Sequence, residues 1–152
     1  MLGPIYPTTA LSLNNLAALL NDTGDTAAVR HLFERALAIR DAVLGPQHPD
    51  TATSLNDLGS LLYAMGDTAA ARPLFERALA IREAVLGPQH PDTALSFDNL
   101  GALLYAMGDT AAARPLFERA LAIREAVLGP QHPYTQIARR DLAALDAADG
   151  RE

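Results

Sequence analysis

Three histidines recur along the chain at a fixed interval, and their side chains are the first candidates for chemistry. His48, His90 and His132 each lie in a Gly-Pro-Gln-His-Pro segment, and consecutive copies are 42 residues apart. Histidine can serve as a metal ligand or a general base. Metal ligands must lie about 2 Å from one ion, whereas packed helices are about 8–10 Å apart. Equivalent histidines therefore cannot share an ion, and we expect each one in a loop near the start of a helix.

Other catalytic arrangements find no support in the sequence. The chain has no cysteine and no lysine, which excludes thiolate metal sites, disulfides and Schiff-base chemistry. It has no glycine-rich phosphate loop, zinc-protease motif or nucleophile elbow. Equivalent residues at a constant spacing do not converge on one point, so we expect no enzyme activity and no cofactor.

Charge and hydropathy exclude further classes of partner. The formal net charge is −6 and the pI is about 5.1, which disfavours nucleic acid or an anionic membrane as the main partner. No apolar run approaches the ~18 residues of a membrane span. The first residues lack the basic and apolar regions of a signal peptide, so we expect a cytoplasmic protein.

The histidine segments mark a repeat that organises the chain as a single repeat domain, residues 1–152. Full units span 3–44, 45–86 and 87–128, and a half-unit spans 129–152. Units 45–86 and 87–128 are identical at 37 of 42 positions. A fixed period between ~20 and ~50 residues indicates stacked supersecondary units, each touching only its neighbours.

Each unit has the pattern of two helices, which predicts an all-α fold. Apolar residues recur at helical spacing over 50–65 and again over about 67–85. Gly66 is predicted to end the first helix and Gly87-Pro88 the second. The charged residues of the second helix are expected on a solvated face; they are Arg72, Glu76, Arg77, Arg82 and Glu83.

The two ends of the chain differ from the repeats between them. Helix 134–148 is expected to be a C-terminal cap, because Arg139 stands where the preceding unit has Phe97 and a cap must meet water. At the other end, residues 1–2 align in register with residues 43–44 of the next unit. We therefore expect the chain to be a piece, or the start, of a longer array.

Several motifs resemble the tetratricopeptide repeat. Leu58-Gly59 in the first helix, and Ala71, Phe75 and Ala78 in the second, are similar to its pattern of small and large residues. The extended unit, with SLNNLA at 12–17, LFERALAIR at 74–82 and LGPQHPDTA at 86–94, resembles the kinesin light chain type. The resemblance implies a right-handed α-solenoid of three helix pairs plus the C-terminal capping helix. It also implies partner binding in a concave groove lined by the first helices.

The differences between the two most similar units indicate where a partner binds. All five fall within eight consecutive residues of the first helix, and four of them, at 53, 56, 57 and 60, share one helical face. Tyr63 extends this face. Diversification for recognition explains the cluster, and drift on an unpacked face after duplication is the alternative.

The candidate partner-binding residues are mostly amides, carboxylates and tyrosines. Asparagine suits the backbone of an extended peptide, and tyrosine gives the contact area typical of binding hot spots. The alternatives are that the asparagines order the stack and that the tyrosines serve helix packing. The candidates are Asn14, Asn15, Asn56, Asp57, Ser60, Tyr63, Asp98, Asn99, Tyr105 and Arg140.

These residues predict a protein-interaction scaffold whose partner is a protein or peptide. Asp57 and Asp98 occupy a face that would carry lysine or arginine in a groove for acidic tails, so we expect a basic or neutral peptide. The acidic, tryptophan-bearing ligands of kinesin light chains are therefore not expected. The alternative function is a structural spacer that associates end to end without a peptide ligand, although a monomer is the expected state.

Overall fold

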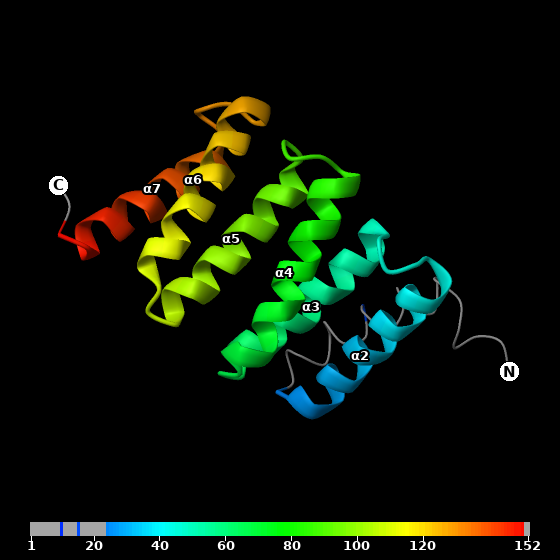
Figure 1. Cartoon of the computed structure of the whole chain (residues 1–152). Helices are drawn as coiled ribbons and strands as arrows, with labels where there is room; N and C mark the ends of the chain where they lie inside the picture. The colour runs from blue at the N-terminus through cyan, green and yellow to red at the C-terminus, as the bar shows by residue number, and fades with distance from the viewer. Residues whose placement is uncertain (1–9, 11–14, 16–23, 151–152) are drawn as a thin grey trace, which may run out of the picture. The chain divides into compact units, whose positions relative to one another are not determined.

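The computed structural model describes residues 10, 15 and 24–150. Within them the helices are α2 (Thr26–Val43), α3 (Pro49–Ala64), α4 (Thr68–Val85), α5 (Pro91–Ala106), α6 (Thr110–Val127) and α7 (Pro133–Ala148). The described residues contain no β-strand, which confirms the all-α fold (Figure 1). The predicted helix bounds agree within one residue. The chain forms two compact units, one ending at Ile81 and the other beginning at Arg82.

The recurring histidines cap the first helices. The backbone N–H of Asp50 donates a hydrogen bond of 3.0 Å to Nδ1 of His48, just before α3. His90 and His132 accept in the same way from the N–H groups of Asp92 and Tyr134, at 3.0 and 3.1 Å. This bond satisfies one of the amide donors that a helix start leaves unpaired. The prediction that these histidines lie near helix starts is confirmed, and their side chains act as N-caps.

Glycine and aspartate form the turn between α3 and α4. Gly66 has a φ of +84°, a conformation that costs glycine nothing and strains other residues. Its N–H donates to the carbonyl oxygen of Tyr63, and the N–H of Asp67 donates to that of Leu62, which closes the end of α3. The carboxylate of Asp67 then accepts from the N–H of Ala70 at 3.1 Å and caps α4. The two helices are therefore joined by a turn of three residues.

One core cluster of the first unit lies between α3 and α4. Ala52 and Leu55 of α3 are fully buried against Ala78 and Ile81 of α4. Phe75, 3% exposed, packs directly on Gly59: a Cβ atom placed on this glycine would lie 2.8 Å from Cε1 of the ring. Glycine is needed at position 59 because the phenyl ring occupies the space that a side chain would take.

The second unit repeats this arrangement between α5 and α6. α6 packs against both α5 and α7 (Figure 1). The ring of Phe117 on α6 lies against Gly101 of α5, 3.1 Å from the place of its absent Cβ. Arg139 on α7 is exposed and bonds Glu125 at 2.7 Å, as expected of a side chain that meets water in place of a core aromatic.

One prediction about the second helices is wrong. Arg82 was expected on a solvated face, but it is only 4% exposed and donates a hydrogen bond of 2.9 Å to Oγ of Ser96. Arg40, 6% exposed, makes the same bond to Ser54 at 2.8 Å. The long apolar stem allows arginine to be buried while its guanidinium finds acceptors. Arg72 and Glu76 do lie on the solvated face and pair at 2.6 Å.

Candidate partner-binding site

The predicted face on α3 is accessible. Thr53, Ser60 and Tyr63 are exposed, and Asn56 and Asp57 are half-buried. Tyr63 is 38% exposed, which is high for a large side chain on a packed helix. Asn56 and Asp57 each take part in an interaction within the structure. We call these five residues the α3 face.

The corresponding positions on α5 form a second face with more apolar surface. We call Leu95, Asp98, Asn99, Ala102 and Tyr105 the α5 face. Leu95 is 41% exposed and Tyr105 is 46% exposed. Asp98, Asn99 and Ala102 are half-buried, and Asn99 also takes part in an interaction. This face is therefore also accessible, with one exposed apolar side chain where the α3 face has a threonine.

Asp98 is not a free carboxylate. It forms an ion pair with Arg124 of α6, and both side chains are largely buried. Burial raises the pKa of Asp98 because it disfavours the charged form, and the nearby carboxylate of Asp141 adds to this effect. The guanidinium of Arg124 acts in the opposite direction. The prediction that Asp98 presents a negative charge to a ligand is therefore weakened by its arginine partner.

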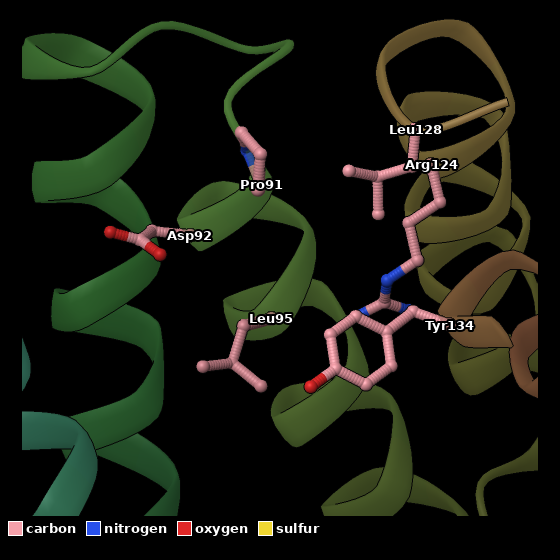
Figure 2. Close-up of a pocket in the computed structure, with 6 residues that line it drawn as sticks. All are labelled: Pro91, Asp92, Leu95, Arg124, Leu128 and Tyr134. Carbon is pink, nitrogen blue, oxygen red and sulfur yellow. The ribbon is translucent and has the colours of Figure 1, made fainter. Parts of the chain in front are cut away.

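A cavity of about 450 Å³ lies beside this ion pair. Side chains from three helices line it: Pro91, Asp92, Leu95, Arg124, Leu128 and Tyr134. Figure 2 shows Arg124, Leu128 and Tyr134 reaching from the end of α6 and the start of α7 toward α5. Pro91, Leu95 and Leu128 give apolar surface to the cavity. The guanidinium of Arg124 supplies a polar group. Such a mixture is typical of a site that binds a side chain and orients it.

The position of Arg124 follows from a substitution in the last half-unit. Arg40 and Arg82 each donate to a buried serine, Ser54 and Ser96. The residue 42 positions after Ser96 is Ala138, which has no acceptor. Arg124 pairs with Asp98 instead, at a position where the preceding unit has Asn56.

Sequence reasoning identified one of the two partners in this pair and missed the cavity. Asp98 was among the predicted site residues, but Arg124, Leu95 and Tyr134 were not. The available signal was that Leu95 and Tyr134 depart from Thr53 and Asp92 of the preceding unit.

None of the other predicted residues that the structure describes is among those that line the cavity. Asn15 and Arg140 are exposed, and neither lines it. Asn14 lies outside the described residues. No group of three potential metal ligands occurs in the part of the chain that the structure describes. Among those residues, no helix combines the length and apolarity needed to cross a bilayer.

The raised pKa of Asp98 predicts a measurable pH dependence of stability. Between the ordinary pKa and the raised one, the folded chain binds this proton more readily than the unfolded chain does. The stability contributed by Asp98 therefore falls as pH rises through that window. We expect the free energy of unfolding of the wild type, relative to Asp98→Asn, to fall from acidic pH towards neutrality. Urea denaturation of both proteins at matched pH measures this difference, and a rise would show that Arg124 outweighs burial.

In a comparison with protein families, one family matches nearly the whole chain. The family described as "Tetratricopeptide repeat" matches residues 8–84, 59–126 and 98–152. The predicted family is therefore confirmed. A comparison with curated proteins gives no match.

Solved structures with similar folds agree with this result. A kinesin-light-chain-like protein of Podospora anserina, with nearly identical repeats, superposes with a TM-score of 0.86 at 27% identity, covering 96% of this chain and 69% of that one. BtubC (BKLC) from P. vanneervenii gives 0.86 at 26% identity, covering 95% and 58%. The first repeat domain of Spaghetti, bound to an HSP90 peptide, gives 0.69 at 16% identity, covering 96% and 97%, which shows likeness of fold. The predicted helical solenoid of kinesin light chain type is confirmed.

Proposed function

The chain belongs to the tetratricopeptide repeat family, and we propose that it is a protein-interaction scaffold that binds a peptide or partner domain along its first helices. The proposed role is binding and involves no catalysis. We also propose the cytoplasm as its compartment. A domain of the same fold, that of Spaghetti, is bound to a peptide, which supports a role of this kind.

One observation carries the proposal: the two near-identical units differ only on the first helix, mostly at accessible positions. Thr53 and Ser60 on the α3 face are exposed, as is Leu95 on the α5 face. The second helices are identical over 18 residues, and their charged side chains are used in contacts between repeats, such as Arg77 with Asp41 at 2.6 Å and Arg119 with Glu83 at 3.4 Å. Change confined to the first helix, while the second helix stays identical, favours selection for recognition.

We further propose that the partner is basic or neutral. Asp92 has a side chain that is 57% exposed, and Asp141 on α7 is near enough to Asp98 to raise its pKa. Arg124 compensates one of these three carboxylates. An acidic peptide would meet the remaining negative charge at close range, which is unfavourable.

Replacing Asn56, Asp57 and Tyr63 together by alanine tests the assignment of the face. We expect partner binding to fall below detection, because the substitutions remove amide, carboxylate and aromatic contacts at once. A pull-down of binding partners with the whole chain, followed by titration of the purified partner, measures the effect. Thermal unfolding of the variant provides the control, since Asn56 and Asp57 also interact within the chain. Unchanged affinity in a folded variant would refute the face as the binding site.

A structural spacer is the second candidate, because α7 leaves large apolar side chains uncovered. Ile137 is 47% exposed and Tyr134 is 61% exposed. Contact between these residues of two copies would join chains end to end. Sedimentation at increasing protein concentration separates the two functions: association without any peptide ligand favours the spacer, and a monomer at all concentrations favours the scaffold.

A further inference from the structure

We propose that the cavity between α5, α6 and α7 receives one bulky apolar side chain of a peptide whose neighbouring residues are basic or neutral. Arg124 is the group that binds the peptide main chain beside this side chain. The inference rests on the proposed function and adds the ligand chemistry of one place on the α5 face.

Two of the residues that line the cavity differ from their counterparts in the unit before. Leu95 and Tyr134 line it, and the residues 42 positions earlier are Thr53 and Asp92. Tyr134 stands where the two units before it have aspartate, so one polar position has become aromatic on a wall of the cavity. Leu95 has apolar counterparts in Leu11 and Ile137, and Thr53 is the exception among the copies. Asp98 and Ala138 are the further departures, and they account for the direction of Arg124, as described above.

The lining of the cavity suits a large apolar side chain, and its volume is sufficient to hold one. Its volume of about 450 Å³ lies at the lower end of the range for small-molecule sites, which is ~300–1,000 Å³. Leu95, Leu128 and Pro91 offer aliphatic surface, and the ring of Tyr134 offers an aromatic wall (Figure 2). Leu95 and Tyr134 are 41% and 61% exposed. A leucine or phenylalanine side chain inserted here would remove this apolar surface from water.

The guanidinium of Arg124 is fixed in place and can donate further hydrogen bonds to an uncharged acceptor. Its side chain is 13% exposed, and its guanidinium is fixed by the carboxylate of Asp98. A guanidinium has five N–H donors in a fixed geometry, and one carboxylate uses at most two of them. Because the positive charge is already compensated, a further acidic partner gains little. A peptide carbonyl oxygen can accept from the guanidinium without introducing a second negative charge.

The charges around the cavity determine which residue types are favoured next to the apolar side chain of the peptide. Asp92 at the start of α5 is among the residues that line the cavity, and its side chain is 57% exposed. Asp98 and Asp141 add two more carboxylates against the single guanidinium of Arg124. Arginine or a neutral residue beside the apolar side chain complements this field, and glutamate opposes it.

A set of synthetic peptides tests the inference with the full chain. The peptides are acetylated and amidated heptamers, Gly-Ser-Xaa-Φ-Xaa-Ser-Gly, in which Φ is Phe, Leu or Ala and both Xaa positions are Arg, Gln or Glu. NMR titration with isotope-labelled protein measures each dissociation constant and identifies the residues that respond. We expect Phe and Leu peptides with Arg or Gln neighbours to bind at least about tenfold more tightly than their Ala or Glu counterparts.

Substitutions in the protein localise the binding. Leu95→Thr, which restores the residue of the preceding unit, and Tyr134→Ala should each weaken the best peptide about tenfold. Both side chains are exposed, so the fold should persist, and thermal unfolding checks this. Val127→Thr is the matched control, because Val127 is 49% exposed on α6 and does not line the cavity. The Val127→Thr variant should bind the best peptide with the affinity of the wild type.

Four results would overturn the inference. The first is that no peptide of the set binds. The second is equal binding by Leu95→Thr and Val127→Thr. The third is that the substitutions alter self-association in sedimentation but leave peptide binding unchanged, which would assign the cavity to a second copy of the chain. Loss of peptide binding in the triple variant of the α3 face, with none in Leu95→Thr, would reject the cavity and retain the proposed function.

Discussion

Replacing Phe75 by alanine is expected to lower the free energy of unfolding by ~3–5 kcal/mol, the usual cost of deleting a buried phenyl ring. Phe75 is 3% exposed, and its ring fills the space beside Gly59. Because glycine has no side chain to move into the gap, the ring's removal should leave a cavity. Chemical denaturation monitored by circular dichroism measures the loss. A decrease below about 1 kcal/mol would contradict this packing role.

The chain offers a matched control for this substitution. Helix α6 has the same sequence as α4, and Phe117 occupies the position of Phe75. Phe117 is half-buried, and its contact with Gly101 is looser, at 3.1 Å from the place of the absent Cβ compared with 2.8 Å for Phe75 and Gly59. Phe117→Ala should therefore cost less than Phe75→Ala. Equal losses would show that helix propensity, common to both sites, dominates over burial.

The helices could be predicted from the sequence because their bounds depend on local chemistry. Gly66 ends α3 through its positive φ, and Asp67 caps α4 through its own carboxylate. Each residue acts on backbone groups only a few positions away, so the sequence contains the whole interaction. The fixed spacing of the repeat then determines that each helix pair is followed by another like it.

The buried arginines could not be predicted in the same way. Arg72 and Arg82 lie on one helix and look alike in the sequence, yet one is exposed and the other is 4% exposed. The difference depends on Ser96, which lies 14 residues further along and accepts the hydrogen bond. A partner at that separation is known only when the helices are placed. Arg124 and the cavity were missed for the same reason, although the helical face that contains Asp98 was identified.

Replacing Ser54 by alanine is expected to lower the free energy of unfolding by ~1.5–3 kcal/mol, the range for a hydrogen bond to a charged group. Ser54 is fully buried, and its Oγ accepts from Nη1 of Arg40 at 2.8 Å. The other acceptor of this nitrogen, the carbonyl oxygen of Asp50, is more distant, at 3.3 Å. Alanine would leave a buried guanidinium with this weaker contact. Urea denaturation measures the change, and Ser60→Ala, at an exposed site, should alter stability by less than about 0.5 kcal/mol.

A double substitution separates the cost of an unpaired arginine from the cost of losing a serine. In Arg40→Met with Ser54→Ala, methionine retains the apolar stem and removes the charge, so neither side chain requires a partner. Replacing both partners of a buried hydrogen bond by apolar groups is close to neutral. We therefore expect the double variant to be more stable than Ser54→Ala alone. If it is less stable, the guanidinium contributes through contacts other than Ser54, and burial of this arginine would be favourable in itself.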